Sequence, residues 1–80
     1  MLGRYGGKVV YSERRDSGGM FNDTLGVEEL PAEVNTPNKF RAFASGSWGG
    51  GVQCFRPTLE EAKAELNRLY DKMHNGYPEN

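Results

Sequence analysis

Hydrophobic residues recur at helical spacing near the C-terminus, and charged residues occupy the positions between them. The apolar positions are Leu59, Ala62, Leu66, Leu69, Tyr70 and Met73. Thr58 and Glu61 have the spacing of a capping box, in which the threonine hydroxyl accepts a hydrogen bond from the backbone N–H three residues later. Gly76 and Pro78 supply stop signals beyond the last apolar position. Together these features predict a helix over residues 58–74.

Two shorter runs before this helix combine large apolar residues with polar ones. In the first run, Phe40 and Phe43 fall on opposite faces of an extended chain. In the second run, Val52 and Phe55 do the same. Glycines between the runs allow the positive φ angles that hairpin loops use. The pattern predicts a hairpin over residues 39–56, with neither face fully open to water.

The N-terminal half of the chain has a less regular pattern. Residues 8–12 are rich in β-branched and aromatic side chains and predict a short strand. Residues 13–38 contain a glycine pair, prolines and many charged residues, which predict a long loop. Within this loop, residues 27–34 fit either an irregular, strand-like segment or a helical turn. Their apolar residues share a helical face, but Pro31 opposes a continuous helix.

These elements predict a single α+β domain over residues 1–80. It would be a small antiparallel sheet of three to four strands with one C-terminal amphipathic helix packed on it. The helix would bury Leu59, Leu66, Leu69 and Tyr70 against the sheet. The sheet would contribute Val10, Val52 and either Phe40 or Phe43. A chain of 80 residues buries only about 60% of the surface of its unfolded form, so this core is small.

Charge is divided unevenly along the chain, although the net charge is only −1. Residues 1–15 and 35–57 are basic, and residues 58–80 are mildly acidic. Residues 16–34, here named the acidic belt, contain acidic side chains and no lysine or arginine. A general nucleic-acid binder is usually more basic than this chain. The pattern therefore indicates either an ordinary mixed surface or a local charged face for a partner.

Cys54 is the only cysteine, so no disulfide or cysteine-based zinc site can form within one chain. The N-terminus lacks the apolar core of a secretory signal. No stretch approaches the roughly 20 apolar residues of a membrane helix. We therefore expect an intracellular protein that is not held in a membrane.

No group of residues predicts a reaction centre. Gly46 and Gly51 have the spacing of a phosphate-binding loop, but the lysine and hydroxyl residue that should follow are absent. His74 is the lone histidine and lies near a helix end, where a residue with no metal-binding role is the simpler interpretation. Cys54 lies in a strand without a neighbouring histidine, which indicates packing rather than catalysis. We expect no catalytic residue, no metal and no other cofactor.

Trp48 is the only tryptophan and lies among the glycines of the predicted hairpin tip. It could fold back over the sheet, stay mobile, or serve as an aromatic anchor for a partner. If it is an anchor, the flanking side chains of Arg41, Arg56, Lys39 and Ser47 would form a polar rim around it.

Residues 39–73 resemble the AP2-like N-terminal DNA-binding domain of tyrosine integrases. In that family two strands joined by a turn precede a helix that opens with Glu-Glu-Ala, as Glu60-Glu61-Ala62 does here. The second strand of the family ends in Phe-x-Thr, which residues 55–58 match with one extra residue. The resemblance implies that the sheet enters the major groove of DNA. The side chains that it would place there are Lys39, Arg41, Ser47, Gln53 and Arg56.

In size and patterning the whole chain resembles the small phage proteins that act against their hosts, such as anti-CRISPR proteins and polymerase inhibitors. The resemblance implies a non-enzymatic protein of the host cytoplasm that sterically blocks a host protein or ribonucleoprotein complex. The acidic belt would suit a basic nucleic-acid channel in such a partner. The residues expected to contact the partner are Trp48, Asp23, Glu28, Glu29, Glu33, Arg41 and Arg56. Nucleic acid is a partner only under the DNA-binding alternative, and an exposed phenylalanine on the sheet would indicate a homodimer.

Overall fold

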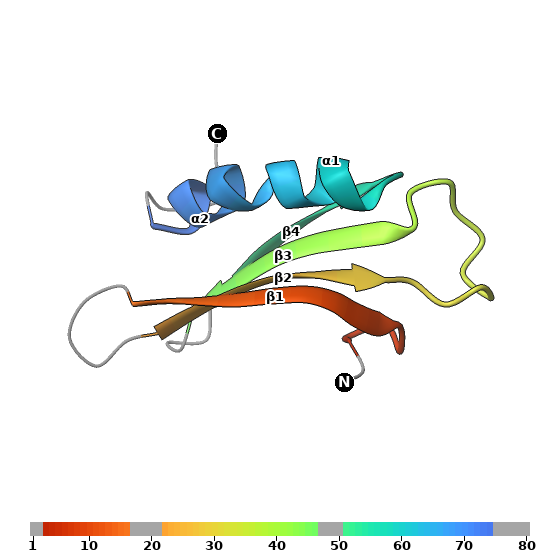
Figure 1. The fold of residues 1–80 in the computed structure, drawn as a ribbon, viewed down its shortest axis with the longest axis horizontal. Coiled ribbons are helices and arrows are strands. Elements are labelled where there is room, and N and C mark those ends of the chain that lie inside the picture. The colour runs from red at the N-terminus through yellow and green to blue at the C-terminus, as the bar shows by residue number, and fades with distance from the viewer. Residues whose placement is uncertain (1–2, 17–21, 47–50, 75–80) are drawn as a thin grey trace.

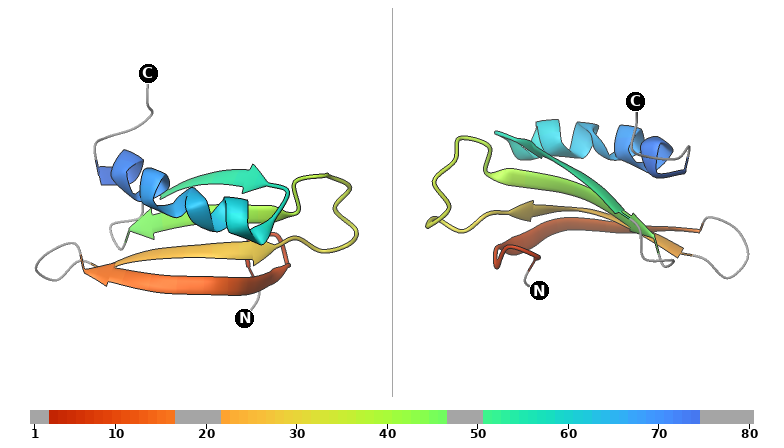
Figure 2. Two further views of the ribbon diagram at one scale, coloured as in Figure 1. Left: turned by 45° about the horizontal axis from the view of Figure 1, so that its top comes forward. Right: turned by 180° about the vertical axis from the view of Figure 1, so that it is seen from behind.

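The structure is a computed structural model that describes residues 3–16, 22–46 and 51–74. Its strands are β1 (Lys8–Asp16), β2 (Asn22–Glu29), β3 (Phe40–Gly46) and β4 (Gly51–Arg56), and its helices are α1 (Leu59–Ala64) and α2 (Leu66–His74). The strands form one antiparallel sheet in the order β1-β2-β3-β4, with both helices on the same face (Figure 1, Figure 2). The predicted α+β architecture is confirmed. The two sides of the sheet are named the helix face and the open face.

The helical segment begins where the capping box predicts. Thr58 is extended, with φ −130° and ψ 158°, and its hydroxyl accepts a hydrogen bond from the N–H of Glu61 at 3.1 Å. Glu65 interrupts the regular helix, because its N–H bonds the carbonyl of Ala62 at 3.1 Å and tightens the turn. The predicted helix over residues 58–74 is thus two short helices that follow one another across the sheet (Figure 1).

The prediction of a loop over residues 13–38 is wrong for residues 13–16 and 22–29, which are strand, whereas residues 30–38 do lie outside any strand or helix. β1 continues to Asp16, and β2 lies between β1 and β3. The sequence of β2, NDTLGVEE, contains a glycine and charged residues, which disfavour a strand when judged locally. In the fold, Asp23 and Glu28 are buried and bonded to distant side chains, while two neighbouring strands fix the backbone. In the ambiguous segment 27–34, the chain leaves the sheet after Glu29 and enters a turn.

The hydrophobic core lies between the helix face and the two helices. Its buried members are Leu25, Val27, Ala42, Ala44, Ala62, Leu66, Leu69 and Met73. Phe40 and Val52 pack against this cluster, as predicted. Val10 does not join it, since this residue lies at an irregularity in the β1–β2 pairing and is 36% exposed. Such an extra residue changes the face to which a side chain points, which the sequence pattern does not reveal.

Phe43, the other candidate for the core, lies instead on the open face, opposite Gly26 of β2. A Cβ atom at Gly26 would lie 2.6 Å from the Phe43 ring, so the ring can occupy this position only above a glycine. The open face therefore carries aromatic side chains of its own, and part of it is covered by the segment that precedes β1.

Candidate functional site

The acidic belt does not form one surface. Asp23 and Glu28 are both 0% exposed, and strand alternation places them on opposite faces of β2. Glu29 at the end of β2 and Glu33 in the following loop are exposed. The structure thus keeps Glu29 and Glu33 as candidate contact residues and removes Asp23 and Glu28 from that set.

Glu28 holds the N-terminal segment against the open face. Its Oε2 atom accepts hydrogen bonds from the backbone N–H groups of Tyr5 at 3.1 Å and Gly7 at 2.7 Å. Its Oε1 atom accepts one from Nε of Arg41 at 2.9 Å. Arg41 is only 5% exposed and also donates to the side chain of Gln53 at 2.9 Å. Arg41 is therefore an internal ion-pair partner and not part of an exposed rim.

Aromatic rings enclose this buried ion pair. The guanidinium carbon of Arg41 lies 5.3 Å from the centroid of the Tyr5 ring and 4.5 Å from that of Phe43. Tyr5 also lies beside Phe55, with ring centroids 6.0 Å apart, and its hydroxyl accepts a hydrogen bond from Gln53 at 3.3 Å. These contacts fix the position of Tyr5, which is itself 43% exposed.

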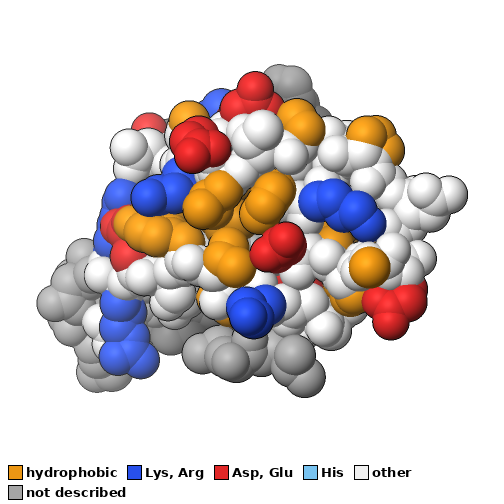
Figure 3. Space-filling model, turned by 45° about the vertical axis from the view of Figure 1, so that its right-hand side comes forward, with side chains coloured by type: hydrophobic (Ala, Val, Ile, Leu, Met, Phe, Trp, Pro, Cys, Tyr) orange, Lys and Arg blue, Asp and Glu red, His pale blue; other side chains and the backbone are white. Residues whose placement is uncertain are grey.

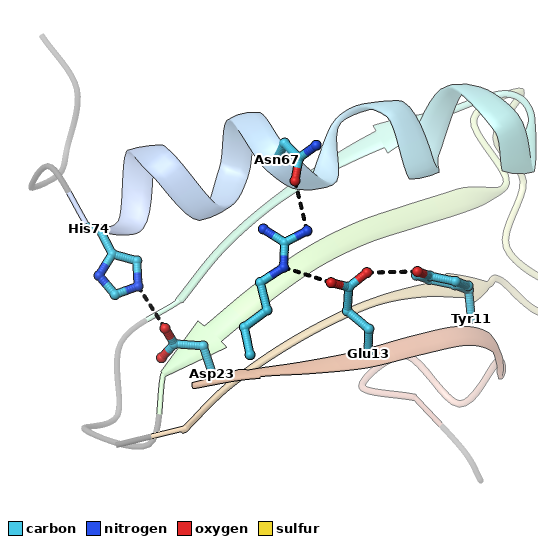
Figure 4. Close-up of polar contacts among 6 residues, drawn as sticks. Tyr11, Glu13, Asp23, Asn67 and His74 are labelled. Carbon is cyan, nitrogen blue, oxygen red and sulfur yellow. Dashed lines mark hydrogen bonds and ion pairs between the residues drawn. The ribbon is translucent and has the colours of Figure 1, made fainter. Parts of the chain in front are cut away.

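Asp23 binds the end of α2 from the helix face. Its Oδ2 atom is 2.6 Å from Nε2 of His74, while its buried Oδ1 atom has no hydrogen-bond partner within the described residues (Figure 4). The His74 ring also packs against that of Tyr70, with centroids 4.5 Å apart. No three metal-ligand side chains gather within the ranges that the structure describes. The contact between Asp23 and His74 therefore holds the end of α2 against β2.

A second polar network joins β1 to α2 (Figure 4). The Tyr11 hydroxyl donates to Oε1 of Glu13 at 2.7 Å, and Nε of Arg15 donates to Oε2 of Glu13 at 2.6 Å. Arg15 also donates from Nη2 to the Asn67 side chain at 2.7 Å. The bond from Tyr11, followed by that from Arg15, lowers the pKa of Glu13. The same bond raises the pKa of Tyr11, because the neutral phenol is the donor.

This network predicts a small loss of stability in acid. The folded pKa of Glu13 lies below its unfolded value, so its contribution is complete above the ordinary glutamate pKa of about 4.3 and disappears as the pH falls through the lowered value. Glu13→Gln should remove this part of the pH dependence of the free energy of unfolding. The part removed should be roughly 0.2–1 kcal/mol, as is typical of exposed pairs. Urea denaturation at several acidic pH values measures the slope of the unfolding free energy against pH. Glu60→Gln, at an exposed position, is the control. An equal slope in wild type and Glu13→Gln would contradict the assignment.

Arg56 points to the helix face, where its Nη2 atom is 3.3 Å from a carboxylate oxygen of Glu65. Nε of Arg68 contacts the same carboxylate at 2.5 Å, and this bond is the main cause of the lowered pKa of Glu65. The Arg56 guanidinium also donates to the carbonyl of Phe55 at 2.6 Å. These contacts place Arg56 against the helices, away from the open face.

Cys54 packs beside the core on the helix face. Burial raises the pKa of its thiol, which favours the protonated and weakly nucleophilic form. His74 contacts Asp23 and not Cys54. The two residues therefore do not form the pair that a cysteine nucleophile would use.

An apolar hollow of about 410 Å³ lies where the N-terminal segment, the loop after β2 and the end of β4 meet. Its lining residues are Tyr5, Leu30, Val34, Thr36, Asn38 and Phe55. Figure 3, turned to bring the β2–β3 loop forward, shows a group of hydrophobic side chains near the centre of the view, with acidic and basic side chains around it. Glu29 and Glu33 directly precede the lining residues Leu30 and Val34. Glu29 itself lies on the helix face, with Lys8 and Phe40 opposite it in the register, whereas Glu33 lies in the loop that lines the hollow. The hollow and the exposed Glu33 form the candidate functional site.

The loop that lines the hollow is held by its own hydrogen bonds. The N–H of Leu30 donates to the carbonyl of Lys39 at 2.7 Å, which closes the loop at its base. The Lys39 ammonium group donates to the carbonyls of Pro31 and Val34. The N–H of Asn38 donates to the Thr36 hydroxyl at 3.2 Å. These bonds preform one wall of the hollow before any partner arrives.

Tyr5 is an aromatic lining residue that the hydrophobic pattern did not single out. A Cβ atom at Gly3 would lie 2.2 Å from Cδ of Glu28, so only a glycine allows the backbone before Tyr5 to pass this close to the Glu28 side chain. Gly3 is therefore the feature of the sequence that indicates this close packing.

Trp48 and Ser47 lie outside the described residues, and the prediction of an aromatic anchor at the hairpin tip stays a prediction. Neither described helix has the length and apolar character needed to cross a membrane. No protein-family model, curated protein or solved structure matches the chain.

Proposed function

We propose that this chain is a non-enzymatic binding protein that sterically inhibits a host protein complex. A CRISPR-Cas complex or another nucleic-acid-handling defence complex is the expected target class. The observation that carries the proposal is the preformed apolar hollow, one wall of which is the loop with the exposed Glu33. Apolar clefts flanked by charge are typical of recognition surfaces, where the cleft supplies affinity and the charge supplies specificity and speed of association.

The arrangement of cations favours a protein partner over DNA. The AP2-like alternative needs basic and polar side chains free on the sheet. Arg41 is buried with Glu28, the Lys39 ammonium group bonds backbone carbonyls, and Arg56 contacts Glu65. Gln53 is exposed on the open face, but an uncharged side chain gives little of the phosphate attraction on which DNA affinity depends.

Charge reversal of the two exposed glutamates tests the proposed contact residues. The double variant Glu29→Lys/Glu33→Lys should bind the inhibited complex at least about tenfold more weakly, because attraction is replaced by repulsion. The matched control is Glu60→Lys/Asp71→Lys, which reverses two exposed carboxylates on the helices. The measurement is retention of an identified bacterial complex on the immobilised protein, together with inhibition of the activity of that complex.

Three outcomes would count against the proposal. Equal retention by both double variants would remove the acidic pair from the interface. Retention of a complex whose activity is unchanged at saturation would exclude inhibition. Binding to duplex DNA that weakens steeply as salt rises, with no complex retained, would favour the DNA-binding alternative.

A further inference from the structure

We propose that the apolar hollow is a binding site for an uncharged small molecule that carries a ring system and one amide or carbonyl group. The site goes beyond the proposed function, because it gives the hollow a ligand besides the protein partner. A ligand held there would occupy part of the surface proposed for that partner and would compete with it. The size of the hollow, its neutral lining, two free polar groups and the fixed position of its walls support this assignment.

The size of the hollow suits a whole small molecule. Its volume of about 410 Å³ lies within the roughly 300–1,000 Å³ range of clefts that hold small ligands. Such clefts are lined mainly by apolar and aromatic side chains, with a few polar groups that fix the orientation of the ligand. The described lining has this composition, since Thr36 and Asn38 accompany two aromatic and two aliphatic residues.

Two aromatic rings determine the shape of the occupant. The ring centroids of Tyr5 and Phe55 are 6.0 Å apart, and the ring planes are tilted by 39° to each other. An aromatic ligand needs roughly 3.5–4.0 Å to the carbon atoms of each neighbour. A third ring therefore does not fit between these two and has to lie across both. A fused ring system in that position can also contact the aliphatic side chains of Leu30 and Val34.

The lining selects against a charged ligand. The described lining residues carry no charged side chain. The Lys39 ammonium group bonds backbone carbonyls, and the Glu28 carboxylate is paired with Arg41. Arg4 and Glu33 adjoin lining residues in sequence, but both are exposed and their charges are screened by water and salt. A charged ligand would lose its contacts with water and gain no opposite charge, which is unfavourable.

Thr36 and Asn38 supply the polar groups that would orient the ligand. The Thr36 hydroxyl accepts a hydrogen bond from the backbone N–H of Asn38 at 3.2 Å. Within the described residues, no other hydrogen bond involves this hydroxyl, and none involves the Asn38 side chain. A hydroxyl that accepts one bond can still donate another, and a carboxamide both donates and accepts. These groups match an amide or carbonyl group of the ligand.

Both walls of the hollow are fixed before a ligand arrives. The Lys39 ammonium group holds the loop through the carbonyls of Pro31 and Val34. The buried Glu28 carboxylate holds the backbone at Tyr5. A preformed site loses less conformational entropy when it is filled, which favours the binding of a small molecule.

Naphthalene-1-carboxamide is the probe that tests this site. Titration into ¹⁵N-labelled protein, followed by NMR, should shift the amide signals of Tyr5, Leu30, Val34 and Asn38 in a saturable way. Naphthalene-1-carboxylate has the same rings and a negative charge, and should bind at least about tenfold more weakly. Acetamide keeps the amide without the rings and should cause no saturable shift.

Variants of the protein provide the second half of the test. Val34→Trp fills the hollow with a side chain of the protein itself and should weaken carboxamide binding at least about tenfold. Val10→Trp, at an exposed position of β1 outside the lining, is the matched control and should bind as wild type does. Asn38→Leu removes the side-chain amide and should weaken binding by roughly two- to tenfold, the effect of one hydrogen bond. Tyr5→Ala removes one wall at a partly exposed position and replaces Val34→Trp if that variant fails to fold.

The outcomes separate this site from the proposed function. Equal affinity for the carboxamide and the carboxylate, or unchanged binding by a folded Val34→Trp, would overturn the ligand site even if a host complex is still retained. Loss of complex retention in Val34→Trp, with no carboxamide binding by wild type, would assign the hollow to a protein and overturn the ligand site alone. Selective carboxamide binding without any retained complex would support the ligand site and count against inhibition.

Discussion

Glu28→Ala is expected to lower the free energy of unfolding by about 3–5 kcal/mol, the usual effect of removing one partner from a buried ion pair. The substitution leaves the Arg41 guanidinium buried without its carboxylate. It also removes the acceptor for the N–H groups of Tyr5 and Gly7. A domain of this length has a total stability of only about 4–12 kcal/mol, so the variant should be close to unfolding at room temperature. Urea denaturation followed by circular dichroism measures the loss.

The neighbouring residue supplies the control for this prediction. Glu29→Ala removes an exposed carboxylate from the same strand and should change stability by no more than about 0.5 kcal/mol. The double variant Glu28→Met/Arg41→Met removes both charges and should recover part of the loss. Recovery should stay incomplete, because the N–H of Gly7 still lacks its acceptor. If the double variant is no more stable than Glu28→Ala, the ion pair is not the source of the effect.

Leu69→Ala is expected to cost about 2–5 kcal/mol. Leu69 is 1% exposed at the centre of the contact between α2 and the sheet, so its truncation leaves a cavity that neighbouring side chains cannot fill without moving. The midpoint of urea denaturation should fall while the slope stays the same, since the folded and unfolded states keep their overall surface.

Val10→Ala is the matched truncation outside the core. Val10 is 36% exposed, and its replacement should change stability by no more than about 0.5 kcal/mol. A loss equal to that of Leu69→Ala would mean that Val10 packs under the helices, as the sequence pattern first suggested. It would contradict the irregular pairing of β1 with β2.

The helix and the hairpin could be predicted because their signals are local. Thr58 and Glu61 act within one turn, and the alternation of β3 and β4 is contained in two short runs. β2 could not be predicted, because its charged side chains are stabilised by residues far away in the chain. Glu28 meets Arg41 thirteen positions later, and Asp23 meets His74 fifty-one positions later. Propensity scales penalise such residues in a strand and take no account of distant partners.

The candidate site was accessible from the sequence only in part. Glu29 and Glu33 belong to the acidic belt, and the structure leaves both on the surface. The hollow could not be foreseen, because three separate segments of the chain contribute to its lining. Arg41 was expected at an exposed rim, since an arginine in a hairpin strand is usually solvated. Only the fold shows that Glu28 lies opposite it in the sheet register.

Each strand of the sheet pairs only with the strands next to it in sequence, and the helices follow the last strand directly. Every pairing step therefore closes a short loop, which keeps the entropic barrier to assembly low for a protein built mainly of strands. The hairpin of β3 and β4 can form first, and β2 and β1 can then add to its free side in turn. The segment around Tyr5 can dock only on a finished β2, so the hollow should be among the last features to appear as the chain folds.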